Sequence, residues 1–284
     1  MSIKLEERAL LVQLSIKQWS ANKQDKKATS DITSQARAAS GAARVHKSLL
    51  PGAFEREEVQ KCARYIRQYF YANTLPWGLD GMQMLPVQNY MDFMAEFRAK
   101  RSHWLTLVDK FCCEYPRLRY QAQQSLGHLY NHDDYPMPSE VERRFDMDLA
   151  VFPVPTNDFR VAIAGDELAR IQNDVVQRVQ EAQAGAMREA WQRLYDRVSK
   201  IAERLADPTA VFRDSLIENA QEICALLPRL NFTNDPQLEY MRQQVEQHLV
   251  VHPEALRTNL TTRENTAQKA QEIMDKMAVF MGGI

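Results

Sequence analysis

DELARIQNDVVQRVQEAQAGAMREAWQRLYDRVSKIAERLA, residues 166–206, is the longest helical pattern in the chain. Apolar side chains recur in it every three or four residues, the spacing that places them on one face of an α-helix. This apolar stripe includes Leu168, Ile171, Val175, Val179, Met187, Leu194, Val198, Ile201 and Leu205. No proline interrupts the stretch, and at ~1.5 Å per residue the predicted helix is about 60 Å long. Such a length exceeds one compact core and indicates a helical hairpin or a coiled-coil arm.

Further helical patterns lie on both sides of this stretch. They cover residues 32–50, 55–71, 87–115 with a continuation at 118–130, 209–227, 236–251, and a last helix from about 261. We expect Pro116 to interrupt the third of them. Thr261 and Glu264 have the spacing of a capping box at the start of the last helix. That helix places Met274, Met277 and Met281 on one side beside Phe280, a face typical of a core or a subunit contact.

Two stretches alternate apolar and polar residues, which is the pattern of half-buried strands. One is 10–18, and the other consists of the runs 148–154 and 159–164 around Pro-Thr-Asn-Asp, which predict a hairpin. Because two strands alone are marginal in water, we expect 10–18 to be their third partner. The apolar stretch TLPWGLDGMQMLP, residues 74–86, is expected to be a packed loop.

These elements predict a mainly α (α+β) fold. It is expected to be a helical bundle with a long helical arm and a small three-stranded antiparallel sheet. The predicted domains are residues 1–164, a mixed helical domain with the sheet, and residues 165–284, a helical-hairpin domain ending in an amphipathic helix.

Composition excludes several classes of protein. The chain has 284 residues, of which 45% are hydrophobic and 26% charged, the ordinary balance of a globular protein. Only 9 glycines occur, and neither a GxGxxG nor a GxxxxGK[ST] motif is present, which argues against a Rossmann or P-loop enzyme. The net charge of −1 is uneven, because residues 1–130 have a balance of +7 and residues 131–284 one of −8. Two such halves can attract each other within one chain or between copies.

The four cysteines form no CxxC pair, and Cys112 and Cys113 are adjacent, a poor geometry for a structural disulfide. Reduced thiols in the cytoplasm are the simplest interpretation. The first residues are acidic where a signal peptide would be basic, and no run of 18 apolar residues occurs. We therefore expect a cytoplasmic protein that does not bind a membrane.

Few residues have the spacing of a catalytic or metal site. His128 and His132 are four residues apart and could share a helix face as metal ligands, but no Glu completes an HExxH motif. The end of a helix followed by an Asn-His-Asp-Asp turn explains them more simply. Cys113 has no positioned histidine, and no GxSxG elbow occurs. We predict no catalytic residue and no cofactor.

The basic N-terminal half offers candidates for binding nucleic acid. Cations with interleaved aromatic side chains can follow a phosphate backbone and stack on bases. The candidate residues are Lys23, Lys26, Lys27, Arg98, Lys100, Arg101, Trp104 and Lys110.

The segment TLPWGLDGMQMLP followed by NYMDFMAEFRAKRSHWLTLVDKF, with QWSANK before it and FPVPTNDFRVAI after it, resembles a family of uncharacterised proteins of tailed bacteriophages and prophages. The resemblance covers roughly residues 8–205. It implies a protein of the host cytoplasm and assigns no active-site residue.

The leading hypothesis is a non-enzymatic phage accessory protein that assembles with itself and binds a macromolecular partner. The apolar stripe of 166–206 and the C-terminal residues Met274, Met277, Phe280 and Met281 are the candidate contacts between copies. A single-stranded nucleic-acid-binding protein that uses the basic half is the alternative. A metal-dependent hydrolase built on His128 and His132 is the second alternative.

Overall fold

A computed structural model describes residues 4–79, 81–156, 165–207 and 209–282. Most of them lie in helices, and the strands form a small antiparallel sheet and a two-stranded one, so the mainly α fold with a sheet is confirmed. The chain forms two compact units. Unit 1 contains residues 1–13, 70–94 and 150–284, and unit 2 contains residues 14–69 and 95–149. The expected domain boundary after residue 164 adjoins the undescribed residues 157–164 and stays a prediction.

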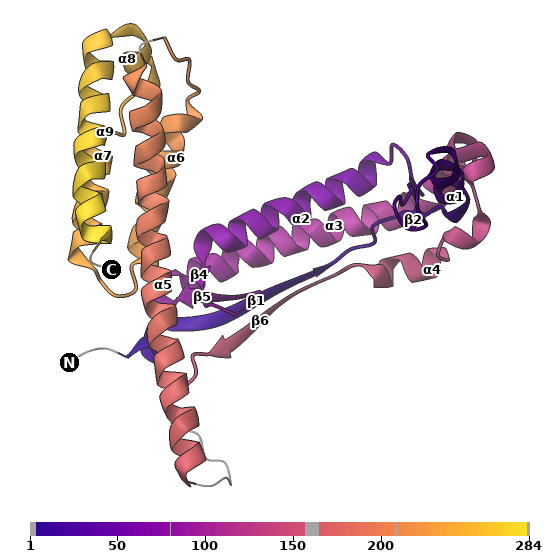
Figure 1. Cartoon of the computed structure of the whole chain (residues 1–284), viewed down its shortest axis with the longest axis horizontal. Coiled ribbons are helices and arrows are strands. Elements are labelled where there is room, and N and C mark those ends of the chain that lie inside the picture. The colour runs from indigo at the N-terminus through magenta and orange to yellow at the C-terminus, as the bar shows by residue number, and fades with distance from the viewer. Residues whose placement is uncertain (1–3, 80, 157–164, 208, 283–284) are drawn as a thin grey trace. The chain divides into compact units, whose positions relative to one another are not determined.

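Unit 1 is built around α5 (Gly165–Ala206), a single helix of 42 residues, which confirms the long helix expected from its apolar stripe. The C-terminal half of α5 packs against α6 (Ser215–Leu230), α7 (Pro236–His248) and α9 (Leu260–Met281), with the short α8 (Pro253–Thr258) before α9. Figure 1 shows α9 running antiparallel beside α5. The core between these helices includes Trp191, Leu194, Leu227, Met241 and Met277.

The sheet has four described strands in the order β4-β5-β1-β6, which corrects the expected three. β1 (Ala9–Lys17) and β6 (Asp146–Pro153) correspond to the strands expected at 10–18 and 148–154. β4 (Leu75–Pro76) and β5 (Met82–Pro86) come from the stretch that was expected to be a loop. The strand expected at 159–164 lies outside the described residues.

The β4–β5 hairpin forms because β5 pairs antiparallel with β1, with Leu11 opposite Met84. Both of these side chains are buried, so the pairing adds to the core of unit 1. Gly78 and Gly81 supply the positive φ angles that the tight connection needs. Pro76 is tolerated because β4 is an edge strand of the sheet.

Unit 2 contains most of α2 (Phe54–Asn73) and α3 (Val87–Leu126), which lie side by side (Figure 1). An ion pair of 2.8 Å joins Glu55 of α2 to Arg117 of α3. The core residues include Ile66, Trp104, Phe111 and Tyr115, all almost completely buried. The chain after α3 forms α4 (Pro138–Val141) and 3-10 turns at Gly127–Leu129, His132–Asp134 and Glu142–Arg144; another such turn, Leu5–Glu7, precedes β1.

The predicted interruption at Pro116 is wrong. α3 passes through the proline and continues for ten more residues. Proline has no N–H, so the carbonyl of Cys112 loses its partner in the helix. The buried side chains of Phe111, Tyr115 and Leu118 continue one apolar face across the proline. Burial of that face outweighs the lost hydrogen bond.

The helix expected at 32–50 is wrong. Only residues 32–35 of it are helical, as the end of α1 (Lys26–Gln35), and residues 46–48 form β3 (His46–Ser48). β3 pairs antiparallel with β2 (Asn22–Gln24), which precedes α1. The carboxylate of Asp25 accepts a hydrogen bond from the Ala28 amide at 2.9 Å and starts α1 early. Arg37 and Gly41 have φ angles of +49° and +89°, which no helix continues through.

Several helix ends also differ from expectation. α6 begins at Ser215 instead of 209 and includes Pro228, and α7 ends at His248 instead of 251. α9 is capped by Asn259, whose side chain accepts from the Thr262 amide at 3.0 Å, and not by the capping box expected at Thr261. Across the described ranges, no helix is long and apolar enough to cross a membrane.

Candidate functional site

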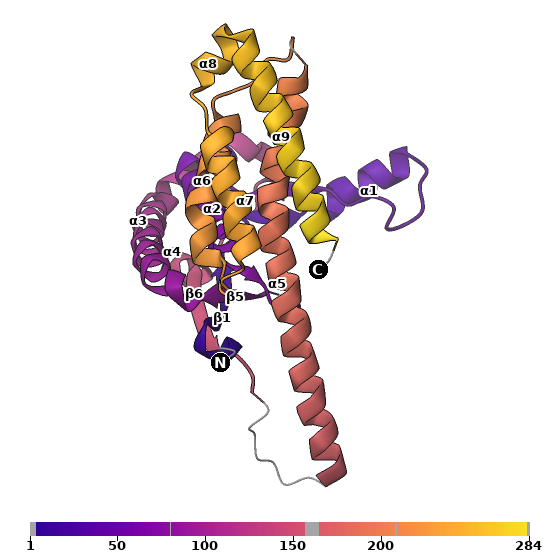
Figure 2. The same cartoon turned by 90° about the vertical axis from the view of Figure 1, so that its left-hand side faces the viewer.

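The apolar stripe of α5 divides into two parts that differ in burial. Met187, Leu194, Val198, Ile201 and Leu205 are buried in the core of unit 1, so this part of the stripe is used within the chain. The other candidates, Leu168, Ile171, Val175 and Val179, are half-buried, and no described residue of α5 before Ala182 is buried. We call residues 165–181 the α5 arm. Figure 2 shows that no other described helix of unit 1 runs alongside its first turns.

The C-terminal candidates lie mostly within unit 1. Met277 is fully buried, and Met274, Phe280 and Met281 are half-buried against the same core. The Phe280 ring lies 5.9 Å from the Trp191 ring of α5. These four side chains serve the contact between α9 and α5, which leaves the arm as the exposed part of the predicted self-assembly surface.

A groove lies at the base of the α5 arm. Its volume is about 680 Å³, and Arg178 and Glu181 supply its charged groups. The apolar lining comes from the β4 loop and from α5, and includes Trp77, Leu79, Val175, Val179 and Ala182. Leu79 is 55% exposed, which is unusual for a leucine beside other apolar side chains. Val175 and Val179 belong both to the arm and to the lining of the groove, so the two adjoin within unit 1.

The basic candidates on α3 are mostly engaged in contacts within unit 2. Trp104 is fully buried, so it is not available to stack on a base, which corrects its proposed role. Arg101 donates a hydrogen bond of 2.8 Å to the carbonyl of Met147. Lys100 pairs with Glu96 at 2.8 Å and lies over the Tyr69 ring. Arg98 and Lys110 are exposed.

The other basic candidates lie on the segment from β2 to α1. Lys23 forms an ion pair of 2.6 Å with Asp134, and Lys47 of β3 approaches the same carboxylate at 2.8 Å. Lys26 and Lys27 begin α1 and are exposed. The structure therefore separates two groups of candidates that the sequence alone had joined.

His128 and His132 lie in separate 3-10 turns and not on one helix face. The His132 ring is within 2.8 Å of the Arg119 guanidinium, a cation that opposes metal binding at the same ring. Within the described ranges, no group of three or more His, Cys, Asp or Glu side chains is placed to hold a metal ion.

Burial makes three of the cysteines poor nucleophiles. It raises the pKa of Cys62, that of Cys112 to about 11 and that of Cys224 to about 12. The thiolate is the reactive form, and a raised pKa keeps these side chains protonated at neutral pH. The fourth cysteine, Cys113, is exposed.

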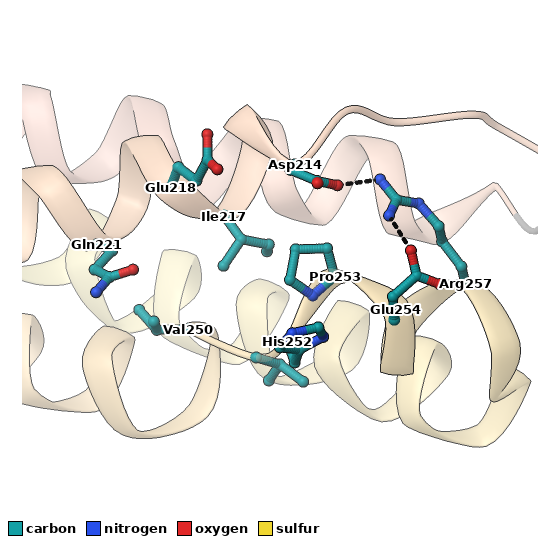
Figure 3. Close-up of a pocket in the computed structure, with 10 residues that line it drawn as sticks. Asp214, Ile217, Glu218, Gln221, Val250, His252, Pro253, Glu254 and Arg257 are labelled. Atoms are coloured by element: carbon teal, nitrogen blue, oxygen red, sulfur yellow. Dashed lines mark hydrogen bonds and ion pairs between the residues drawn. The ribbon is translucent and has the colours of Figure 1, made fainter.

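A second cavity, of about 420 Å³, lies between α6 and the segment that leads into α8 (Figure 3). At one end Arg257 donates to Asp214 and, at 2.8 Å, to Glu254. Its guanidinium is thus already paired with two carboxylates. The remaining lining is mixed and includes Ile217, Glu218, Gln221, Val250, His252 and Pro253. The paired arginine stabilises this corner of unit 1 and is not free to bind an anionic ligand.

Two features of these surfaces were missed from sequence. The contribution of Trp77 and Leu79 to the groove depends on the β4–β5 hairpin, and its signal was the pair Gly78 and Gly81 in an apolar stretch. Arg37 and Arg44 were not among the basic candidates because the expected helix 32–50 hid the hairpin on which they lie.

Comparison with known proteins adds no relative to this description. No family model, no curated protein and no solved structure matches the chain.

Proposed function

We propose that this chain is a non-enzymatic, self-assembling protein whose copies join through the α5 arm. The observation that supports this most is the change in burial along the apolar stripe of α5. The apolar residues are buried from Met187 to Leu205, Val179 packs at the edge of the core, and Leu168, Ile171 and Val175 are only half-buried. A helix that keeps its apolar face beyond its own core gains stability when a further surface covers that face.

A second copy of the same arm is the occupant that the charges favour. On a helix of 3.6 residues per turn, Glu167 and Arg178 lie on the same flank of the stripe. When two arms cross antiparallel with Ile171 of one copy facing Val175 of the other, equal flanks face each other. Glu167 pairs with Arg170 of its own helix at 3.5 Å, and in this crossing it also lies beside Arg178 of the other copy, which gains a carboxylate partner.

The groove fits the same arrangement. In the antiparallel crossing, Leu168 of the second copy lies level with Val179, which lines the groove together with Trp77 and Leu79. An isologous contact of this kind closes on itself and forms a dimer. In this arrangement the groove contacts the end of the partner's apolar stripe, and the arm contacts the centre of that stripe.

We further place this assembly, from the resemblance stated above, in the cytoplasm of a bacterium that carries a tailed phage. There it would act by binding a macromolecular partner.

Light scattering after size exclusion tests the self-assembly. At tens of micromolar the wild-type chain should have the mass of a dimer, twice 32.9 kDa. Val175→Glu places a charge in the seam and should give a monomer. Gln177→Glu adds the same charge about 200° away around the helix and should leave the dimer intact. A monomeric wild-type chain, or equal effects of the two variants, would contradict the proposal.

A further inference from the structure

The segment from β2 to β3, residues 22–48, is a strongly basic part of unit 2. We call it the basic hairpin. It has two acidic residues, Asp25 and Asp31, and six cationic ones, Lys23, Lys26, Lys27, Arg37, Arg44 and Lys47. Its two strands form a stem, with Lys23 directly opposite Lys47, and α1 and the residues after it form the tip.

The stem is fixed by one carboxylate. Like charges opposite each other on paired strands repel, but Asp134 lies between Lys23 and Lys47 at 2.6 and 2.8 Å. Only 4% of the Asp134 side chain is exposed. Lys47 also donates to the carbonyl of Leu129 at 2.6 Å. These two lysines are therefore structural, and the stem holds the tip in place.

The tip contains the other four cations. Lys26, Lys27, Arg37 and Arg44 are exposed, and in the described part of the chain none of them forms an ion pair. Val45, next to Arg44, bonds both to Asp25 and to Thr29, so Arg44 lies near the start of α1. Lys26 and Lys27 also begin α1, while Arg37 follows its end. The tip thus has four exposed cations against the carboxylates of Asp25 and Asp31, a net charge of +2.

The free protein stabilises this tip poorly. α1 has 10 residues and no buried side chain, and isolated helices of that length are marginal in water. Lys26 and Lys27 add positive charge to the end of α1 that is already positive. A bound polyanion would remove both costs, because it would neutralise the lysines and bury one side of the helix.

The length of the tip is sufficient to reach several phosphates of a nucleic acid. At ~1.5 Å per residue, α1 is about 15 Å long, and a duplex has about nine phosphates over that distance at one per ~1.7 Å. No Phe, Tyr or Trp occurs in residues 22–48, so the hairpin has no platform on which bases could stack. We infer that the basic hairpin binds the phosphate backbone of double-stranded nucleic acid, independently of base sequence.

Fluorescence anisotropy with a labelled 30-base-pair DNA duplex tests this inference on the full chain. Four phosphate contacts predict a slope of about −3.6 in a plot of log affinity against log salt, or roughly 100-fold weaker binding at 200 mM than at 50 mM salt. The test variant replaces Lys26, Lys27, Arg37 and Arg44 by Gln. It should lose most of that slope and bind at least about tenfold more weakly at 50 mM salt.

The matched control removes four exposed cations from unit 1 instead. It replaces Lys200, Arg204, Arg213 and Lys276 by Gln. Because both variants lose the same charge, a general effect of net charge would weaken them equally. Circular dichroism checks that both remain folded, which we expect because all eight side chains are exposed.

The inference predicts that the control binds like the wild type. It is overturned if the wild-type chain does not bind the duplex at 50 mM salt, or if the control loses as much affinity as the test variant. It is also overturned if a 30-nucleotide single strand binds more tightly than the duplex, or if phosphatidylserine vesicles and not DNA retain the chain.

Discussion

At the scale of single residues, Arg263 stabilises the end of the longest helix. Its side chain is 7% exposed and donates to the carbonyls of Arg204, Asp207 and Ala210 at 3.1, 2.5 and 2.8 Å. The last carbonyls of a helix have no partner within it, so this guanidinium acts as the C-terminal cap of α5.

Arg263→Met should therefore lower the free energy of unfolding by about 2–4 kcal/mol, because several carbonyls lose a charged donor in a buried place. Urea unfolding followed by circular dichroism measures this. Arg213→Met is a matched control and should leave the free energy of unfolding nearly unchanged, since Arg213 is an exposed arginine of the same unit. A change below about 0.5 kcal/mol for Arg263→Met would show that the cap is not needed.

Asp134 makes the basic hairpin sensitive to acid. Burial opposes ionisation of the carboxylate, but the hydrogen bonds and charges of Lys23 and Lys47 outweigh it and lower the pKa of Asp134. Because the pKa is lower folded than unfolded, the stabilisation is complete above the ordinary aspartate value of about 3.9 and is lost as the pH falls below it.

Limited proteolysis should consequently cut residues 22–48 faster at pH 3 than at pH 7. A protease that is active at the given pH is used in each case, and its cleavage rate is calibrated on an unfolded peptide. Asp134→Asn should give fast cleavage already at pH 7, because Lys23 and Lys47 then repel each other without a counter-charge. Asp133→Asn, at the neighbouring exposed position, should behave like the wild type. Equal cleavage of the two variants at pH 7 would contradict the structural role of Asp134.

At the scale of elements, Pro116 destabilises α3 because it removes one hydrogen bond from the helix. Pro116 is exposed, and its ring serves no contact in the core of unit 2. Pro116→Ala restores an N–H for the carbonyl of Cys112 and removes the clash with the preceding turn. The variant should be more stable than the wild type by about 1–3 kcal/mol, measured by thermal or urea unfolding. Lower stability would mean that α3 needs the proline for its course.

Periodicity predicted the elements whose side chains bury one another along a helix, and it failed where partners come from elsewhere. The stripe from Leu168 to Leu205 was sufficient to predict α5. β5 was missed because its strand conformation depends on pairing with β1, more than 65 residues earlier. Pro76 and Pro86 also favoured a loop, since proline donates no hydrogen bond to a sheet. α1 was missed because it has no apolar face at all, and only the Asp25 cap marks its start.

The candidate surfaces, like the helices and strands, could be predicted from sequence only in part. The apolar stripe and the basic residues are properties of the sequence, so their existence was clear from it. Which part of each is free is a matter of packing: α9 covers the stripe near Trp191, and burial removes Trp104 from any binding surface. Alternation alone does not describe burial in β1, because the adjacent residues Leu11 and Val12 are both buried while Leu14 and Ile16 are half-buried.

At the scale of the whole molecule, the two proposals give the chain two binding surfaces. We propose the α5 arm of unit 1 for a second copy and the basic hairpin of unit 2 for a phosphate backbone. Two copies that pair through their arms would present two basic hairpins, and linked sites bind a long polymer more tightly than single ones when both can reach it.

Antiparallel pairing of two α5 arms is tested by exchanging the charges of Glu167 and Arg178 and measuring the molar mass in solution. Glu167→Arg and Arg178→Glu each place like charges side by side in the proposed contact, so each single variant should be largely monomeric at tens of micromolar. The double variant restores both pairs with opposite polarity and should regain the dimer mass. Dimers for both single variants, or a monomeric double variant, would contradict the account.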